Sequence, residues 1–189
     1  MGNDTRRVPV LRQAQDRYIA AWGQMGAAWG ISRTMAEVHA LLYITGQPMN
    51  TDEIMDRLQI SRGNASMSVR ALLDWGIVSR THKRGDRKEY YAAEKDVWSL
   101  FRAIVRERMK REVDPLIASL FEIRDLTSLE TSAKGTAPTA EDKQALLEHN
   151  KRLDSMLSFF RTLDKLGQRF ASPQGRGLEM AATLLGKVS

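Results

Sequence analysis

A polar run at residues 61–70 carries side chains that can hydrogen-bond the edges of DNA bases. Asn64 can bond adenine in the major groove, Arg70 can bond guanine or phosphate, and Ser66 suits either partner. Met67 can meet the methyl group of thymine. The candidate contacts to bases and to nearby phosphates on this run are Ser61, Arg62, Gly63, Asn64, Ser66, Met67 and Arg70.

A second segment, Arg80–Lys88, concentrates positive charge. It holds five Lys or Arg residues and His82 against the single acid Asp86. Gly85-Asp86 is a turn signal, so we expect a tight hairpin tip. A polyanion would relieve the repulsion at such a tip, which favours contacts to the DNA backbone or minor groove. The residues assigned to this contact are Arg84, Arg87 and Lys88. The alternative is a hairpin whose charges only keep it soluble.

These residues need a helix-turn-helix to position them. Thr51–Leu58 is predicted as a short helix with Thr51 as N-cap, and Gln59-Ile60 as the turn. Ser61 should cap a second helix, Arg62–Trp75, which Gly76 ends. Four apolar positions of that helix share one side and should face the core: Ala65, Val69, Leu72 and Leu73. The polar candidates are then left on the opposite side.

A β-hairpin should follow, with strands Ile77–His82 and Glu89–Ala92. Helix, turn, helix and basic hairpin form the order of a winged helix-turn-helix. We therefore expect a mainly α protein with a winged helix-turn-helix domain and long flanking and C-terminal dimerisation helices. The expected parts are residues 1–30 (N-terminal helix), 31–94 (winged helix-turn-helix), 95–130 (connecting helix), 131–139 (linker) and 140–189 (C-terminal dimerisation helices).

The flanking helices show helical periodicity and end at recognisable breaks. The expected ranges are Val10–Trp29, Thr34–Thr45 with Ser32 as cap, Lys95 to about Leu129 with a kink or a restart at Asp114-Pro115, Ala140–Phe170, and a short last helix at Leu178–Leu185. Ala140–Phe170 repeats at seven residues. Leu146, Leu153 and Phe160 mark one heptad position, and Met156, Leu163 and Phe170 mark the other with His149 as a polar member. We expect this helix to pack on a partner chain and on the preceding long helix, with Leu146, Leu153, Met156, Phe160 and Leu163 in the dimer contact.

Composition excludes several classes of function. The chain has no cysteine, and its three histidines are scattered, so a metal site or cysteine chemistry is not expected. Gly-rich phosphate loops are absent, and we expect neither an enzyme nor a cofactor. The formal net charge of +6 favours an acidic partner. No apolar run is long enough to cross a membrane and no signal sequence is visible, so we expect a cytoplasmic protein.

The sequence resembles the GbsR-type subgroup of the MarR-like transcriptional regulators, which includes repressors of glycine-betaine synthesis. Three runs carry the resemblance: Ser61-Arg62-Gly63-Asn64-Ala65-Ser66-Met67-Ser68-Val69-Arg70-Ala71-Leu72, Asp74-Trp75-Gly76 and Gly85-Asp86-Arg87-Lys88-Glu89-Tyr90-Tyr91. It extends from about Tyr18 to Pro115 and implies a homodimeric bacterial or archaeal DNA-binding regulator. Tyr91-Ala92-Ala93-Glu94 stands where better-known MarR members have a Leu-Thr step, and no match beyond about Glu130 supports ligand residues.

The expected function is a sequence-specific DNA-binding transcriptional regulator, a repressor, acting as a homodimer on a pseudo-palindromic operator in double-stranded DNA. Aromatic side chains could also cage a small-molecule effector such as a quaternary ammonium compound. The candidates are Tyr18, Trp22, Trp29, Tyr43 and Trp98, for which plain core packing is the alternative. Two other functions stay open: an architectural or chromosome-maintenance winged-helix protein without strong sequence preference, and a winged-helix module that binds an acidic protein partner.

Overall fold

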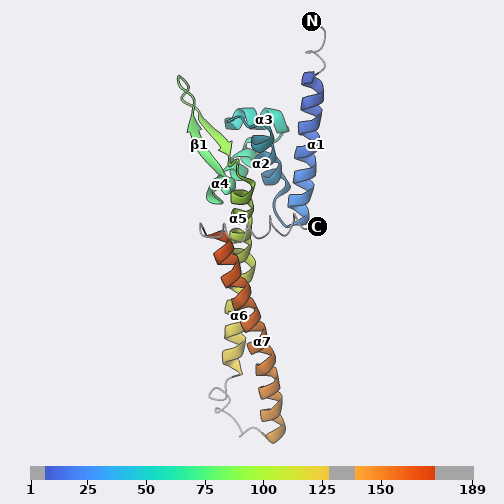
Figure 1. Cartoon of the computed structure of the whole chain (residues 1–189), viewed down its shortest axis with the longest axis vertical. Helices are drawn as coiled ribbons and strands as arrows, with labels where there is room; N and C mark the ends of the chain where they lie inside the picture. The colour runs from blue at the N-terminus through green and yellow to red at the C-terminus, as the bar shows by residue number, and fades with distance from the viewer. Residues whose placement is uncertain (1–6, 128–138, 173–189) are drawn as a thin grey trace, which may run out of the picture. The chain divides into compact units, whose positions relative to one another are not determined.

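The protein was analysed as a computed structural model, which describes residues 7–127 and 139–172. The chain divides into two compact units, Met1–Phe101 and Arg102–Ser189. The described elements of the first unit are α1 (Arg7–Ala28), α2 (Arg33–Thr45), α3 (Thr51–Leu58), α4 (Arg62–Asp74), β1 (Val78–His82), β2 (Glu89–Ala93) and the start of α5 (Val97–Arg108) (Figure 1). Helix, turn, helix and hairpin occur in the predicted order.

The core of the first unit is built around α2. Val38 and Leu41 are fully buried on this helix, and Ile54 of α3 and Leu72 of α4 are buried with them. Each such aliphatic side chain contributes about 1.5–3 kcal/mol on burial. The strands β1 and β2 pair antiparallel from Val78↔Ala93 to His82↔Glu89. This core therefore fixes the positions of α3, α4 and the hairpin relative to one another.

The base of the hairpin is also tied to the loop between α2 and α3. Met49 pairs with Tyr91 through two backbone hydrogen bonds. The Met49 amide donates to the Tyr91 carbonyl oxygen at 3.0 Å, and the Tyr91 amide donates to the Met49 carbonyl oxygen at 2.8 Å. Tyr90 and Tyr91 are both buried. The hairpin, which forms the wing (Val78–Ala93), is thus anchored on the loop before α3 as well as through its own strand pairing.

Helix caps mostly follow the sequence prediction, with one correction. Asn50, and not Thr51, is the N-cap of α3. Asn50 Oδ1 accepts from the Glu53 amide at 3.0 Å, and a Glu53 carboxylate oxygen accepts from the Asn50 amide at 2.8 Å. This reciprocal capping box needs Glu at the third helical position, which places the cap at Asn50. Ser32 and Ser61 cap α2 and α4 as predicted.

The turn between α3 and α4 passes through Gln59 in the left-handed conformation, with φ 54°. This conformation is costly for a residue with a Cβ atom. The Gln59 side-chain amide donates to the Asp56 carbonyl oxygen at 2.7 Å, which holds the turn. The left-handed position that ends α2 is instead taken by Gly46, with φ 62°.

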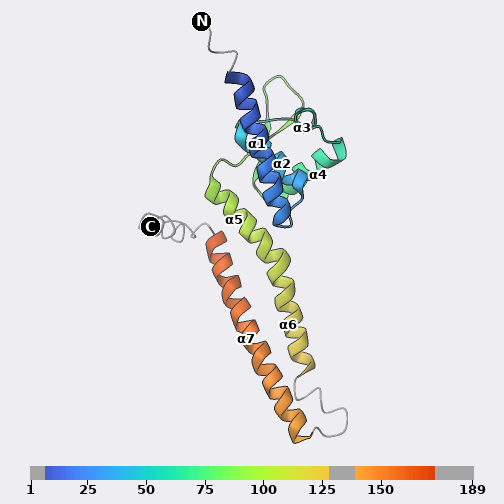
Figure 2. The ribbon, with the colours of Figure 1, turned by 90° about the vertical axis from the view of Figure 1, so that its right-hand side faces the viewer.

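The second unit is a helical hairpin. Its described elements are the rest of α5, the π-helical turn η1 (Met109–Val113), α6 (Asp114–Leu126) and α7 (Ala140–Ala171), and α6 and α7 lie side by side in both views (Figures 1 and 2). The restart predicted at Asp114-Pro115 is present, because the π-helical turn ends at Val113 and α6 begins at Asp114 with Pro115 in its first turn. Thr139, predicted as the end of the linker, is the N-cap of α7. The rest of the linker and the predicted helix Leu178–Leu185 lie outside the described residues.

In the contact between α6 and α7, one of the two inward-facing heptad positions differs from the prediction. Leu146, Leu153 and Phe160 are half-buried, but the second position that faces inward is Asn150 and Leu157, both buried. Asn150 accepts from the Thr127 hydroxyl and donates to the Thr127 carbonyl oxygen at 3.1 Å. Met156 and Leu163, predicted at that second position, are 48% and 36% exposed. Asn150 was not among the predicted heptad positions, and its side-chain amide is satisfied by Thr127.

Candidate nucleic-acid interface

Helix α4 has an apolar face and a polar one. Ala65, Val69 and Leu72 are buried as predicted, whereas Leu73 is only half-buried and Ser68 takes the fourth buried position. The opposite side is open, with Met67 71% exposed. Asn64, Ser66 and Arg70 are exposed as well. The structure therefore presents together the four side chains predicted to contact bases.

The N-terminus of α4 presents the candidates for phosphate contacts. Ser61 is exposed, and its hydroxyl oxygen accepts from the Asn64 amide at 3.3 Å. A Cβ atom on Gly63 would meet only this hydroxyl oxygen, at 3.9 Å, so the chain itself does not require glycine there. Arg62 is exposed, and its guanidinium donates to the Asp52 carboxylate at 2.7 Å. The first turn of α4 thus offers open backbone and one cation held by an acid of α3.

The wing tip is organised around Asp86. Its carboxylate accepts from the Tyr90 hydroxyl at 2.7 Å and from the Lys88 amide at 2.9 Å. The hydrogen bond from Tyr90 is the largest cause that lowers the pKa of Asp86 below its ordinary value. Lys83 lies over the Tyr90 ring, with its Nζ atom 4.0 Å from the ring centre. Gly85-Asp86 was expected as a turn signal, and the structure adds that the Asp86 carboxylate links Tyr90 and Lys88 at the tip.

Ion pairs divide the cations of this surface into two groups. Lys88 donates to the Asp52 carboxylate at 3.1 Å, Lys83 lies 4.0 Å from a Glu53 oxygen, and Arg80 lies 3.6 Å from a Glu89 oxygen. Three further cations make no ion pair with residues 7–127 or 139–172, and these are Arg70, Arg84 and Arg87. The unpaired cations include two of the three residues assigned to the wing contact.

The aromatic candidates are brought together only in part. Tyr18 stacks on Trp22 and on Tyr43, with ring centres 5.8 and 6.4 Å apart. His39, which the sequence analysis did not select, lies in the same cluster, 6.0 Å from Tyr43 and 6.1 Å from Trp22. Trp98 instead contacts Phe101, and Trp29 is exposed. The five candidates therefore do not form one cage.

His39 is the most buried member of this cluster, at 2% exposure. Neither ring nitrogen has a hydrogen-bond partner within the described part of the chain. Burial lowers its pKa from 6.5 to about 4, so the ring is neutral at pH 7. Its spacing from Tyr43, four residues on one helix, is the signal that could have placed it in the cluster.

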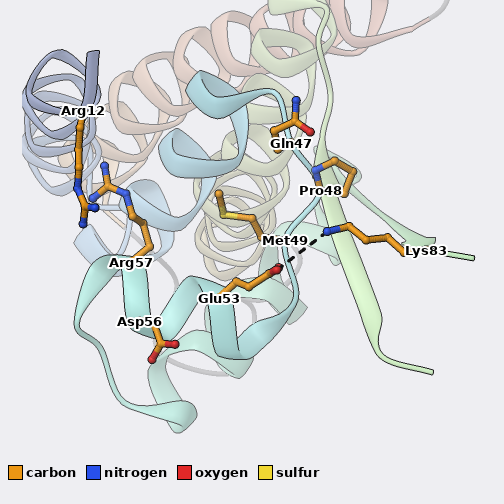
Figure 3. A pocket seen from close by; sticks show the side chains of 8 residues that line it. All are labelled: Arg12, Gln47, Pro48, Met49, Glu53, Asp56, Arg57 and Lys83. Atoms are coloured by element: carbon orange, nitrogen blue, oxygen red, sulfur yellow. Dashed lines mark ion pairs between the residues drawn. The ribbon is translucent and has the colours of Figure 1, made fainter. Parts of the chain in front are cut away.

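A pocket of about 560 Å³ lies beside α3. Figure 3 shows its lining residues, which come from α1, the loop before α3, α3 and the wing: Arg12, Gln47, Pro48, Met49, Glu53, Asp56, Arg57 and Lys83. Arg57 pairs with Asp16 of α1 at 2.5 Å, which ties α1 to α3.

Among the described residues, no group of three or more His, Asp or Glu side chains is placed to hold a metal ion. None of the described helices is long and apolar enough to cross a membrane.

Comparison with known proteins matches residues 29–89 to the model of the MarR family. The HTH-type transcriptional repressor GbsR of Bacillus subtilis (strain 168) is 30% identical over 113 residues, which span 60% of this chain and 62% of that protein. From the same organism, the putative HTH-type transcriptional regulator YvaV is 26% identical over 86% of this chain and 90% of its own length. The HTH-type transcriptional repressor OpcR, also from this organism, is 23% identical over 87% of this chain and 88% of its own length.

A solved structure described as the crystal structure of a transcriptional regulator has a similar fold. Its TM-score is 0.53 at 18% identity, and the match covers 88% of this chain and 99% of that one. The match to the family model begins directly after α1 and ends at the first residue of β2, so it covers α2, α3, α4, β1 and the tip of the hairpin.

Proposed function

We propose that this chain, whose residues 29–89 match the model of the MarR family, is a DNA-binding transcriptional regulator, namely a repressor that binds a pseudo-palindromic operator as a homodimer. The observation that supports this most is the exposed polar face of α4 next to the basic wing on one rigidly packed unit. The names of the relatives GbsR and OpcR, both repressors, support the direction of regulation. Relatives that regulate transcription also favour a non-enzymatic role.

In this proposal α4 lies in the major groove. Asn64, Met67 and Arg70 are exposed on one side of the helix and can reach base edges there. Ser66 completes the set of base contacts, while Ser61, Arg62 and the open backbone at Gly63 contact phosphate. On the wing, Arg84 and Arg87 are free to contact the DNA backbone at once, and Lys88 can join them when it leaves Asp52. The base contacts then determine sequence preference and the cations determine affinity.

A homodimer would present two such helices about 34–36 Å apart, one turn of DNA. The second unit has exposed apolar surface available for this contact, contributed by Leu116, Ile123 and Leu126 of α6 and by Leu147, Met156, Phe159, Leu163 and Leu166 of α7. Soluble monomers rarely leave so many large apolar side chains uncovered. Of the predicted dimer residues, Met156 and Leu163 belong to this surface, whereas Leu146, Leu153 and Phe160 are half-buried on the side of α7 that carries Leu157.

An effector remains a narrower proposal. Tyr18, Trp22 and Tyr43 stand close enough to share a cationic ligand such as a quaternary ammonium compound, whereas Trp98 contacts Phe101. Their stacked rings are also what plain core packing between α1 and α2 produces. Choline and betaine added to the protein–operator complex test the proposal, because an effector must change DNA affinity. The variant Trp22→Leu should abolish any such change.

The regulatory proposal is tested by selecting bound sites from random DNA duplexes with the full chain. Recovery of a two-fold symmetric site with half-sites one turn apart is the expected result. Binding without sequence enrichment would favour an architectural protein. Failure to retain any duplex at low salt would favour a module that binds an acidic protein.

A further inference from the structure

Asp52 joins the two DNA-contacting elements of the unit. It lies at the second position of α3, and its two carboxylate oxygens have different partners. One oxygen accepts from the Arg62 guanidinium at the start of α4, at 2.7 Å, and the other accepts from Lys88 Nζ on the wing, at 3.1 Å. Arg62 and Lys88 are 26 residues apart in sequence, so only the fold brings both to one acid. We call these three side chains the Asp52 clamp.

The clamp is exposed and electrostatic. All three side chains reach solvent, with side-chain exposures of 43% for Asp52, 68% for Arg62 and 56% for Lys88. The hydrogen bond from Lys88 and then that from Arg62 lower the pKa of Asp52, so the acid is ionised at neutral pH. Exposed ion pairs of this kind add little to folding stability. Their position beside the candidate DNA surface therefore calls for a role other than holding the fold.

A carboxylate that accepts from a guanidinium and an ammonium group occupies the same donors that a DNA phosphate would use. We infer that Asp52 is an internal phosphate mimic, which engages Arg62 and Lys88 in the free protein and must release them before they can contact DNA. The inference rests on the proposed function, because it assigns a competitor to the same phosphate contacts. It makes Asp52 a residue that sets DNA affinity without contacting a base.

The clamp acts on every duplex alike. Phosphates are the same in all sequences, so the cost of opening the clamp is also the same on operator and on random DNA. Two exposed ion pairs of ordinary strength change an equilibrium about threefold. For a dimer whose subunits both open their clamps, removal of the acid should thus raise affinity about tenfold. The ratio between operator and random DNA should not change.

The test measures binding of a short random-sequence duplex by fluorescence anisotropy, for the wild-type chain and for Asp52→Asn. Tighter binding by Asp52→Asn is expected. Asp56→Asn is the matched control, because it removes the same charge from an exposed acid of the same helix that makes no ion pair within the described residues. The control should raise affinity much less than Asp52→Asn. Equal gains in both variants would overturn the inference, since a general change in net charge would then explain them.

A double-variant cycle with Arg62→Gln completes the experiment. In that background one of the two clamped cations is gone, so Asp52→Asn should give a smaller gain, and an undiminished gain would contradict the clamp. Thermal unfolding of each variant shows that the chain is folded. If all variants bind duplex but Asp52→Asn binds equally or more weakly, the clamp inference fails and the regulatory proposal stands. If no variant, including wild type, binds duplex at low salt, the proposed function itself fails.

Discussion

The buried histidine of α2 makes a sharp prediction about stability and pH. His39 has a pKa of about 4 in the folded chain, against 6.5 when it is free in solvent. Between these two values the unfolded chain binds a proton at this ring and the folded chain does not, so the free energy of unfolding falls as the pH is lowered. It stays constant with respect to this group above pH 6.5. One pKa unit corresponds to about 1.4 kcal/mol, so the full difference is about 3 kcal/mol.

The perturbation is His39→Phe, which keeps an aromatic ring next to Trp22 and Tyr43 and removes both unpartnered nitrogens. The larger ring will shift stability by a constant amount through packing. What matters is therefore how the difference between wild type and variant changes with pH. When the pH is lowered from about 7 to about 4.5, the free energy of unfolding should fall by about 2–3 kcal/mol more in wild type than in the variant. Carboxylates titrate equally in both chains and cancel.

Urea unfolding followed by tryptophan fluorescence measures this difference in unfolding free energy. It reports on the structural unit that contains His39, because all four tryptophans lie within residues 1–101. His82→Gln, which removes an exposed histidine of the same unit, is the control and should keep the pH dependence of wild type. The reasoning would be refuted if wild type and His39→Phe differed in unfolding free energy by the same amount at both pH values. It would mean that the ring is charged in the core or finds a hydrogen-bond partner there.

The remaining predictions concern DNA binding and assembly. Arg70→Ala should cost about 1–3 kcal/mol on the selected site with an unchanged thermal midpoint, whereas a destabilised variant would show that α4 buries this side chain. With 6–10 phosphate contacts per dimer, affinity should fall by about 10³–10⁵ between 50 and 200 mM salt, and a flat dependence would contradict the interface. Arg87→Ala should weaken operator and random DNA equally in the same anisotropy assay. Leu163→Asp combined with Leu166→Asp should dissociate the dimer in sedimentation. The control Lys151→Asp, at an exposed polar position of α7, should leave the dimer intact. A double variant that remains a dimer would place the interface elsewhere.

The helix-turn-helix could be predicted because local signals were strong there. Ser61 as cap, the apolar spacing Ala65, Val69 and Leu72, and the Gly85-Asp86 turn each specify a short-range structure that the fold keeps. The cap of α3 was missed by one residue because Asn50 and Thr51 both favour cap positions. Only the return hydrogen bond from the Glu53 carboxylate separates them, and that is a matter of side-chain geometry.

The contacts that sequence reasoning missed are those made across the fold. The acid Asp52 fits the first turn of any helix, so nothing in its neighbourhood predicts partners on α4 and the wing. The seam of α7 was ambiguous because positions 149 and 156 and positions 150 and 157 are all three or four residues from Leu153. Apolar residues made the first set look correct. The partner that decides it is Thr127, which precedes α7 by a segment that no periodicity can bridge.

The left-handed residue between α3 and α4 has a consequence for DNA binding that concerns conformational freedom. A glycine at position 59 would adopt this φ without strain and would also reach many other angles. Gln59 accepts a cost of about 1–2 kcal/mol in backbone energy, partly offset by its hydrogen bond to Asp56, and the turn then has few other conformations. The range of angles that α3 and α4 can adopt relative to each other is thereby restricted before any DNA is present. Less entropy is lost on binding, so Gln59→Gly should leave every contact to DNA in place and still weaken the complex.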